Sequence, residues 1–204
     1  MFSWVSAAAS ERIAVGYGLV DWDAETSAYK VAVSRTADPQ TAADWSFPLS
    51  FAPAFNRFPW GDLTAFNGRF ALALSTTTIP TQLQMARALT AEPLAAADWS
   101  IHTISDAPRD FWFPRITVAH GRLLVTALHT RPDVALDQHA LLRALTVEPA
   151  GSEDWALTSV NTPRDVPTGG AAASMFASPT ADGRIAVSYD SAGLYLISLS
   201  DGPW

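Results

Sequence analysis

Residues 83–99, LQMARALTAEPLAAADW, form a block that occurs three times in this chain of 204 residues. The other copies are YKVAVSRTADPQTAADW at residues 29–45 and HALLRALTVEPAGSEDW at residues 139–155, and all three align without a gap. Each copy contains a threonine, an acidic residue followed by proline, and a closing Asp-Trp pair. Agreement at so many positions identifies an internal repeat, which is the signature of a repeat architecture.

A second block precedes each copy and occurs four times. It begins with arginine and continues as a short apolar run, at Arg12, Arg69, Arg122 and Arg184. The fourth unit stops at Trp204, near the place of its acid-proline turn. The register therefore predicts a single domain of three complete units and one incomplete unit, with approximate bounds 1–54, 55–108, 109–165 and 166–204.

The apolar runs within a unit are short, rich in β-branched residues and bounded by turn formers, which is typical of strands rather than helices. In the second unit we expect strands near Asp62–Phe66, Arg69–Thr76, Leu83–Thr90 and Trp99–Ile104. The Asn67-Gly68 pair predicts a tight hairpin between the first two strands. Four antiparallel strands in each repeat of about 55 residues describe an all-β fold, a β-propeller of about four blades whose last blade is incomplete.

The sequence is compatible with more than one way of closing the ring of blades. The last unit lacks its outermost strand, and an exposed sheet edge favours pairing with another strand. We therefore expect a closed monomer, a homo-oligomer joined through the final blade, or a protein partner at that edge. We interpret the recurring tryptophans as residues that pack between blades, because large aromatic side chains dominate cores.

Composition excludes several classes of function. The chain has 13 basic and 20 acidic residues and a formal charge of −7, which argues against nucleic-acid and anionic-membrane partners. It contains no cysteine, so disulfides, thiolate catalysis and cysteine-based zinc sites are excluded. The N-terminal segment lacks the features of a secretory signal, and no apolar run approaches the length of a membrane span, so we expect a cytoplasmic protein. The dispersed histidines predict no metal site and no cofactor.

Two segments carry a family resemblance. Residues 113–131, FPRITVAHGRLLVTALHTR, and residues 56–75, NRFPWGDLTAFNGRFALALS, resemble the strand pairs of bacterial sialidase-like repeat proteins. In place of that family's Asp-box the chain has its acid-proline and Asp-Trp block, in which only the tryptophan corresponds well. The chain length is similar to that of four-bladed hemopexin-like propellers.

The sialidase resemblance implies an arginine triad, a tyrosine nucleophile with an acidic partner, and a separate acid/base carboxylate. Tyr17 and Tyr189 occupy equivalent second-strand positions that favour packing, and the glutamates fall in predicted turns. We therefore identify no catalytic residue from the sequence.

A binding site is predicted on the face where outer strands connect to the next inner strand and second strands connect to third strands. Arginines in those connections suit a carboxylate or sulfate, and tryptophans suit a sugar face. The candidate ligand-binding residues are Asp21, Asp23, Arg57, Trp60, Arg109, Trp112, His129, Arg131 and Arg164.

Three functions remain open at this stage. The leading hypothesis is a non-catalytic recognition or assembly module that binds an acidic glycan or a protein partner on this loop face. The alternatives are a sialidase-like glycoside hydrolase and a structural subunit that joins a larger complex through its open blade edge. Propellers host many unrelated functions, so the fold alone does not choose among them.

Overall fold

The computed structural model describes residues 2–21, 23–51, 60–76, 81–105, 110–131, 134–160, 175–191 and 194–199. Its described part contains fifteen β-strands in four antiparallel sheets, together with three single turns of 3-10 helix. The predicted all-β propeller of about four blades is confirmed. Within these residues, no helix is long and apolar enough to cross a membrane.

Each blade is a meander in which consecutive strands pair. The strands of the first blade are β1 (Phe2–Ala9), β2 (Ile13–Asp21), β3 (Thr26–Ser34) and β4 (Trp45–Phe51). Those of the second are β5 (Gly61–Phe66), β6 (Arg69–Ser75), β7 (Leu83–Ala88) and β8 (Trp99–Thr103). The third blade has β9 (Asp110–Ala119), β10 (Arg122–Arg131), β11 (Val134–Ala144) and β12 (Trp155–Val160), and the fourth has β13 (Met175–Pro179), β14 (Ile185–Ser191) and β15 (Leu194–Leu199).

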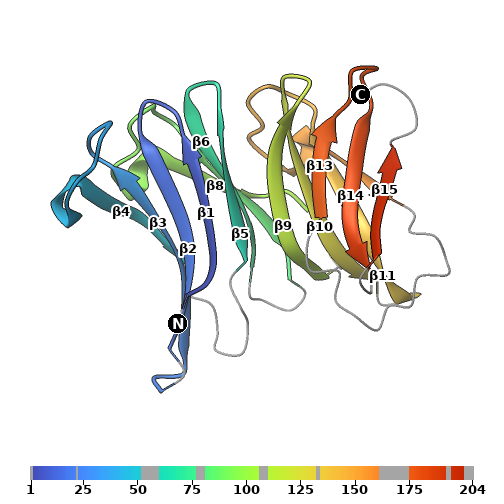
Figure 1. The fold of residues 1–204 in the computed structure, drawn as a ribbon, viewed down its shortest axis with the longest axis horizontal. Helices are drawn as coiled ribbons and strands as arrows, with labels where there is room; N and C mark the ends of the chain where they lie inside the picture. The colour runs from blue at the N-terminus through green and yellow to red at the C-terminus, as the bar shows by residue number, and fades with distance from the viewer. Residues whose placement is uncertain are drawn as a thin grey trace.

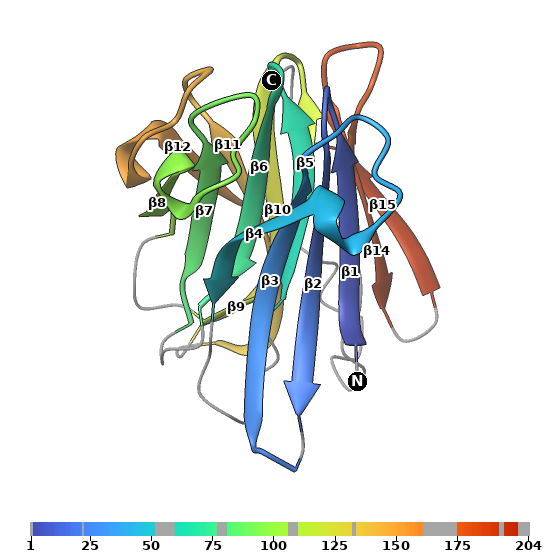
Figure 2. The same ribbon diagram turned by 90° about the vertical axis from the view of Figure 1, so that its left-hand side faces the viewer.

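The blades stand in succession along the long axis of the molecule, from blue to red in Figure 1. Figure 2 looks onto the first blade, with the strands of the last blade behind it. The innermost strands make the contacts between blades: β1 lies against β5, β5 against β9, and β9 against β13. Within the described strands, β13 makes no comparable contact with β1.

Tight hairpins join the first two strands of the second and third blades. Asn67 and Gly68 have φ of 51° and 72°, and His120 and Gly121 have φ of 48° and 69°. Two successive positive φ angles define the turn whose twist matches a two-residue hairpin, as the Asn-Gly pair predicts. The register of each inner strand against the second strand is set from this turn.

The recurring Asp-Trp pair has a separate structural role for each residue. Asp44, Asp98 and Asp154 end the three 3-10 turns, η1 (Ala42–Asp44), η2 (Ala96–Asp98) and η3 (Ser152–Asp154). Asp98 Oδ2 accepts the main-chain N–H of Ala95 at 2.8 Å, and Asp44 Oδ2 accepts that of Thr41 at the same distance. Each carboxylate thereby satisfies a turn donor that would otherwise lack a partner in the chain.

Two of the three recurring tryptophans, Trp99 and Trp155, pack between blades, as expected. Trp99 lies in the core between the first and second blades with Tyr29 and Val31, and Trp155 lies in the core between the second and third blades with Met85. Both side chains are buried. A smaller core between the third and fourth blades contains Leu124, Leu141, Ala177, Ile185 and Val187.

Candidate functional site

One repeat position on the innermost strands carries four different side chains, one in each blade. Each lies three residues before the residue that pairs with the apolar residue directly after the arginine of the second block. The pairs that define this position are Ala9 with Ile13, Ala65 with Phe70, Val118 with Leu123, and Pro179 with Ile185. The four residues, named here the axial position, are Ser6, Asp62, Arg115 and Phe176.

The side chains at the axial position reach from one inner strand to the next. Ser6 Oγ accepts the main-chain N–H of Leu63 at 3.1 Å, and Asp62 Oδ2 accepts that of Ile116 at 3.0 Å. Leu63 and Ile116 are themselves equivalent, because each directly follows the axial residue of its own blade. The first two blade junctions therefore use the same hydrogen bond with a different acceptor.

The third junction departs from this pattern because arginine offers only donors. The Cζ atom of Arg115 lies 5.0 Å from the centre of the Phe176 ring, a cation–π distance, and Nη1 of Arg115 lies 4.0 Å from Oδ1 of Asp62. The Phe176 ring stays 53% exposed. A carboxylate, a guanidinium and an exposed aromatic ring thus meet on three consecutive inner strands.

Burial controls the electrostatics of the axial position. The side chain of Asp62 is 15% exposed and that of Arg115 is 18% exposed. Burial raises the pKa of the Asp62 carboxyl above its ordinary value, and the N–H of Ile116 and the charge of Arg115 oppose that rise. Burial also lowers the pKa of Arg115, which Asp62 counteracts. The pair is therefore a largely buried carboxyl, with its pKa raised by burial, beside a largely buried guanidinium.

Aromatic side chains gather beside this pair. Trp60 lies two residues before Asp62, and its ring centre is 5.5 Å from that of Trp112 and 4.3 Å from that of Phe113 on β9. The Trp60 and Trp112 rings are nearly perpendicular, with an interplanar angle of 78°. Both tryptophans are partly exposed, and along the chain they lie two residues before Asp62 and three residues before Arg115.

Phe113 has a φ of 52°, a left-handed conformation that is uncommon for a bulky residue. It lies where the register between β9 and β10 shifts, between the pairs Arg115 with Thr126 and Trp112 with Leu128. An extra residue in one strand of a pair produces such a bulge and redirects the neighbouring side chains. Strained backbone of this kind clusters at ligand sites, so the conformation of Phe113 is consistent with a binding site at this end of β9.

Comparison with known proteins supports the fold. No protein-family model and no curated protein sequence matches the chain. An endo-arabinase from Bacteroides thetaiotaomicron is similar in structure, with 15% identity and a TM-score of 0.56 over 98% of this chain and 76% of that one. A family 117 glycoside hydrolase from Zobellia galactanivorans aligns with 13% identity and a TM-score of 0.51, over 98% of this chain and 65% of the enzyme.

Both solved structures are β-propeller glycoside hydrolases. At these identities the likeness shows the propeller fold, and it is not specific to the sialidase type.

The residues predicted for the loop-face site have different outcomes. Trp60 and Trp112 meet edge to face, although they come from different repeats. Arg57, Arg109 and Arg164 lie outside the described residues, so the convergence of these arginines stays a prediction. His129 and Arg131 lie on β10, where only the backbone is described.

The Asp21 and Asp23 pair forms a turn rather than a recognisable ion site. Asp21 Oδ1 accepts the main-chain N–H groups of Asp23 and Ala24, at 3.1 and 3.0 Å, and both aspartates are exposed. Among the described residues, no group of three or more acidic or histidine side chains is placed to hold a metal ion.

The axial residues were absent from the predicted site. Ser6, Asp62, Arg115 and Phe176 hold the same repeat position but are four different residue types. A comparison of repeated residue types therefore does not find them. Aligning the units on their hairpin turns and comparing the residues at each position finds them, because the hairpin fixes the register of the inner strand.

Proposed function

We propose that this protein is a carbohydrate-active propeller that hydrolyses a glycosidic bond at the axial position, with Asp62 as the proton donor. The observation that carries the proposal is the meeting of Asp62, Arg115 and Phe176 on consecutive inner strands, with the Trp60 and Trp112 rings beside them. The resemblance to two glycoside hydrolases supports the choice of substrate class at the level of the fold.

The chemistry requires a carboxyl that is protonated when the substrate arrives. Burial raises the pKa of Asp62, so a larger fraction of the group carries its proton near neutral pH than an exposed aspartate would. As the glycosidic C–O bond breaks, this proton passes to the leaving oxygen. The positive charge of Arg115 then stabilises the carboxylate that remains.

Hydrolysis also requires a second carboxylate to activate the water that adds to the anomeric carbon, or to attack that carbon directly. The side chain of Asp110, at the start of β9, lies outside the described part of the structure, so no residue is assigned to this role. The aromatic rings would hold the sugar, because aromatic faces and edges bind the apolar side of a pyranose or furanose ring while the polar groups supply orientation.

A second candidate function is glycan recognition without catalysis. It is favoured by the bond from Ile116 N–H to Asp62 Oδ2, which gives the carboxylate a structural role between the second and third blades. A carboxylate that holds two blades together, beside an arginine and two tryptophans, would bind a sugar and leave it intact.

One experiment separates the two functions. The purified protein is incubated with a panel of aryl glycosides, including an α-L-arabinofuranoside, and with arabinan and other polysaccharides, and both released product and binding are measured. Hydrolysis is expected with at least one member of the panel. Asp62→Asn should lower the rate by about 100-fold or more, the typical contribution of a positioned acid.

Asp38→Asn is the matched control, because Asp38 is an exposed aspartate in the turn after β3. Its rate should equal that of the wild type. Binding without product would replace the proposal with the recognition function, and hydrolysis that survives in folded Asp62→Asn would remove Asp62 from the mechanism.

A further inference from the structure

Tyr29 is a buried titratable side chain that the proposed mechanism does not use. It lies on β3, the third strand of the first blade, and its side chain is fully buried. Its hydroxyl oxygen lies 3.4 Å from Oγ of Ser6, which holds the axial position on β1. Tyr29 therefore reaches over β2 to the innermost strand of its own blade.

Two glycines leave room for the Tyr29 ring. A Cβ at Gly16 on β2 would lie 2.1 Å from the Tyr29 hydroxyl oxygen, and a Cβ at Gly61 on β5 would lie 2.8 Å from Cζ of the ring. Glycine is the residue that allows such a close approach. The ring is thus held between a strand of the first blade and the innermost strand of the second.

This arrangement does not follow from the repeat. Tyr29, Leu83 and His139 hold the same repeat position, at the start of the three aligned blocks. Gly16 is equivalent to Ala73, because each lies four residues after the arginine of its second block. Positions that only support the blades keep their residue type from unit to unit, as the Asp-Trp pair does. The tyrosine and the glycine that makes room for it are therefore specific to the first blade.

The bonds of Ser6 determine the direction of its O–H group. Ser6 Oγ accepts the main-chain N–H of Leu63 at 3.1 Å. The same side chain also bonds the Asp62 carboxyl and the Tyr29 hydroxyl. A serine hydroxyl has one proton and two lone pairs, and an ionised carboxylate only accepts. Ser6 therefore donates its proton to Asp62, and its second lone pair accepts the proton of Tyr29.

This chain of bonds favours the ionised form of Asp62. Burial raises the pKa of Asp62, and the bond from Ser6 opposes that rise together with the N–H of Ile116 and the charge of Arg115. Burial also raises the pKa of Tyr29, so its hydroxyl keeps its proton and remains a donor. Tyr29 on β3 and Arg115 on β9 are the titratable and charged side chains that interact with Asp62.

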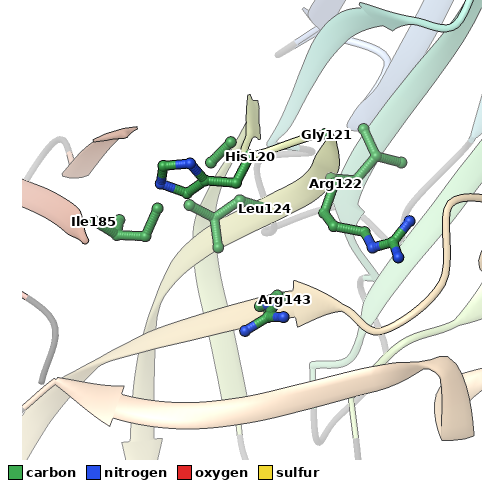
Figure 3. Close-up of a pocket in the computed structure, with 8 residues that line it drawn as sticks. His120, Gly121, Arg122, Leu124, Arg143 and Ile185 are labelled. Carbon is green, nitrogen blue, oxygen red and sulfur yellow. The ribbon is translucent and has the colours of Figure 1, made fainter. Parts of the chain in front are cut away.

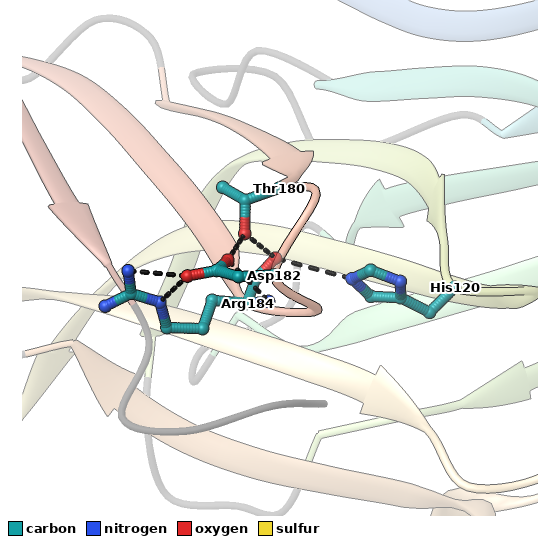
Figure 4. Close-up of polar contacts among 4 residues, drawn as sticks. All are labelled: His120, Thr180, Asp182 and Arg184. Atoms are coloured by element: carbon teal, nitrogen blue, oxygen red, sulfur yellow. Dashed lines mark hydrogen bonds and ion pairs between the residues drawn. The ribbon is translucent and has the colours of Figure 1, made fainter.

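A second aspartate shows what similar donors do where burial is weak. Asp182 bonds the Thr180 hydroxyl and the Arg184 guanidinium, with Arg184 Nε to Asp182 Oδ2 at 2.7 Å (Figure 4). These donors lower the pKa of Asp182 to about 2, and its side chain is 52% exposed. At Asp62 a hydroxyl and a guanidinium act in the same direction, but burial exceeds them. Each donor to Asp62 therefore affects how readily the carboxyl holds its proton.

Ion pairs between blades also occur at the acid-proline turns. Arg12 of the first blade bonds Glu92 of the second. Nη1 of Arg69 and Nη1 of Arg87 in the second blade lie 3.6 and 3.5 Å from Oε1 and Oε2 of Glu148 in the third. The glutamate side chains are 50% and 60% exposed, so water screens these pairs. The buried carboxyl at the axial position is screened less, so its bonds have a larger effect on its charge.

The cavity between the third and fourth blades is separate from these bonds. It has a volume of about 290 Å³, and His120, Arg122 and Arg143 lie around it (Figure 3). Its lining includes neither Asp62 nor any residue that bonds Asp62. A ligand in that cavity, or a proton on His120, would therefore not act on Asp62 through a bond.

We propose that Tyr29 is a positioning residue for Asp62 and acts through Ser6. The Tyr29 hydroxyl donates to Ser6 Oγ, which directs the Ser6 O–H toward the Asp62 carboxyl and holds that carboxyl where Arg115 contacts it. The use of Asp62 as an acid rests on the proposed function, whereas the link from Tyr29 to Asp62 is a property of the folded chain. The first blade thereby takes part in a site formed by the second and third blades.

The test measures the protonation of Asp62 in the full chain without a substrate. Aspartate labelled with ¹³C at the side-chain carboxyl is followed by NMR during a pH titration, and Asp62→Asn identifies the Asp62 signal. Tyr29→Phe should raise the proton affinity of Asp62 about twofold, because the Ser6 bond loses the polarising effect of its neighbour. Ser6→Ala should raise it about tenfold, as expected for the loss of one hydrogen bond to a charged group.

Two controls and a double variant isolate the path through Ser6. Tyr17→Phe, which removes a tyrosine hydroxyl from β2, should leave the titration of Asp62 unchanged. The signal of Asp182 in each variant is the internal reference and should not move. Tyr29→Phe in the Ser6→Ala background should add nothing, because the two changes break the same chain of bonds. Thermal unfolding checks that each variant folds, and Tyr29→Phe alone decides if Ser6→Ala does not fold.

The outcomes separate this proposal from a packing role and from the proposed hydrolysis. If Asp62 titrates as in the wild type in folded Tyr29→Phe, even with a lower melting temperature, the proposal is overturned and Tyr29 only packs. A full Tyr29→Phe effect in the absence of the Ser6 hydroxyl would also overturn it. A chain that hydrolyses no glycoside but shows the expected titration shifts would keep the link and remove the proposed function. Where hydrolysis is found, the falling limb of its pH–rate profile should move to higher pH in Tyr29→Phe and in Ser6→Ala.

Discussion

Replacing Trp99 with alanine tests the packing between the first two blades. The Trp99 side chain is 6% exposed, and its Nε1–H donates to the main-chain oxygen of Pro93 at 3.3 Å. A tryptophan buries roughly 150–250 Å², which corresponds to about 4–6 kcal/mol of transfer free energy at ~25 cal/mol per Å². Alanine retains part of that burial, so the free energy of unfolding should fall by about 3–5 kcal/mol.

Trp45→Ala provides the matched comparison. Trp45 holds the same repeat position in the first blade, which has no described blade in front of it, and its side chain is only half-buried. Its replacement should cost less, because less of its surface is buried. Urea unfolding followed by far-ultraviolet circular dichroism measures both, with the slope of the transition checked for a two-state process. A cost below about 1 kcal/mol for Trp99→Ala, or an equal cost for the two variants, would refute the packing argument.

Three further predictions concern stability. Gly16→Ala should destabilise the protein by about 1–3 kcal/mol, because a Cβ there would lie 2.1 Å from the hydroxyl oxygen of the buried Tyr29; an unchanged melting temperature would contradict this. Asp98→Ala should cost about 0.5–2 kcal/mol in urea unfolding, because the N–H of Ala95 loses its acceptor, and Asp98→Asn should recover part of the loss. Glu148→Gln should cost less than about 1 kcal/mol, because its side chain is 60% exposed; a larger loss would mean that this contact is shielded from water.

The blade pattern could be predicted from the sequence because equivalent positions in the units carry the same residue types with the same structural roles. Asp44 and Asp98 accept main-chain N–H groups of their turns, and Trp99 and Trp155 pack on the preceding blade, so the same structural demands leave the same residues in these units. The strands expected in the second unit agree with β5 to β8 to within two residues, which is the usual uncertainty of strand ends.

The candidate site could not be predicted in the same way. Asp62 and Arg115 hold equivalent positions but carry opposite charge, and their contact depends on how neighbouring inner strands lie against each other. The arginine and glutamate contacts were also hidden, because Glu148 was identified as a turn residue and its partners are about 60 residues or more away in the chain. The Asp62–Arg115 pair and the arginine–glutamate contacts become visible only once one blade is placed against the next.

The pH dependence of hydrolysis, measured for the wild type and Arg115→Gln on the best substrate of the glycoside panel, tests the role of Asp62 most directly. Asp62 must be protonated to act, so the rate should fall as pH rises through its pKa, which burial places above the ordinary value. The charge of Arg115 lowers that pKa, so its removal should move the falling limb to higher pH. If the falling limb of the pH–rate profile of Arg115→Gln stays in place or moves to lower pH, the assignment of Asp62 as the acid is contradicted.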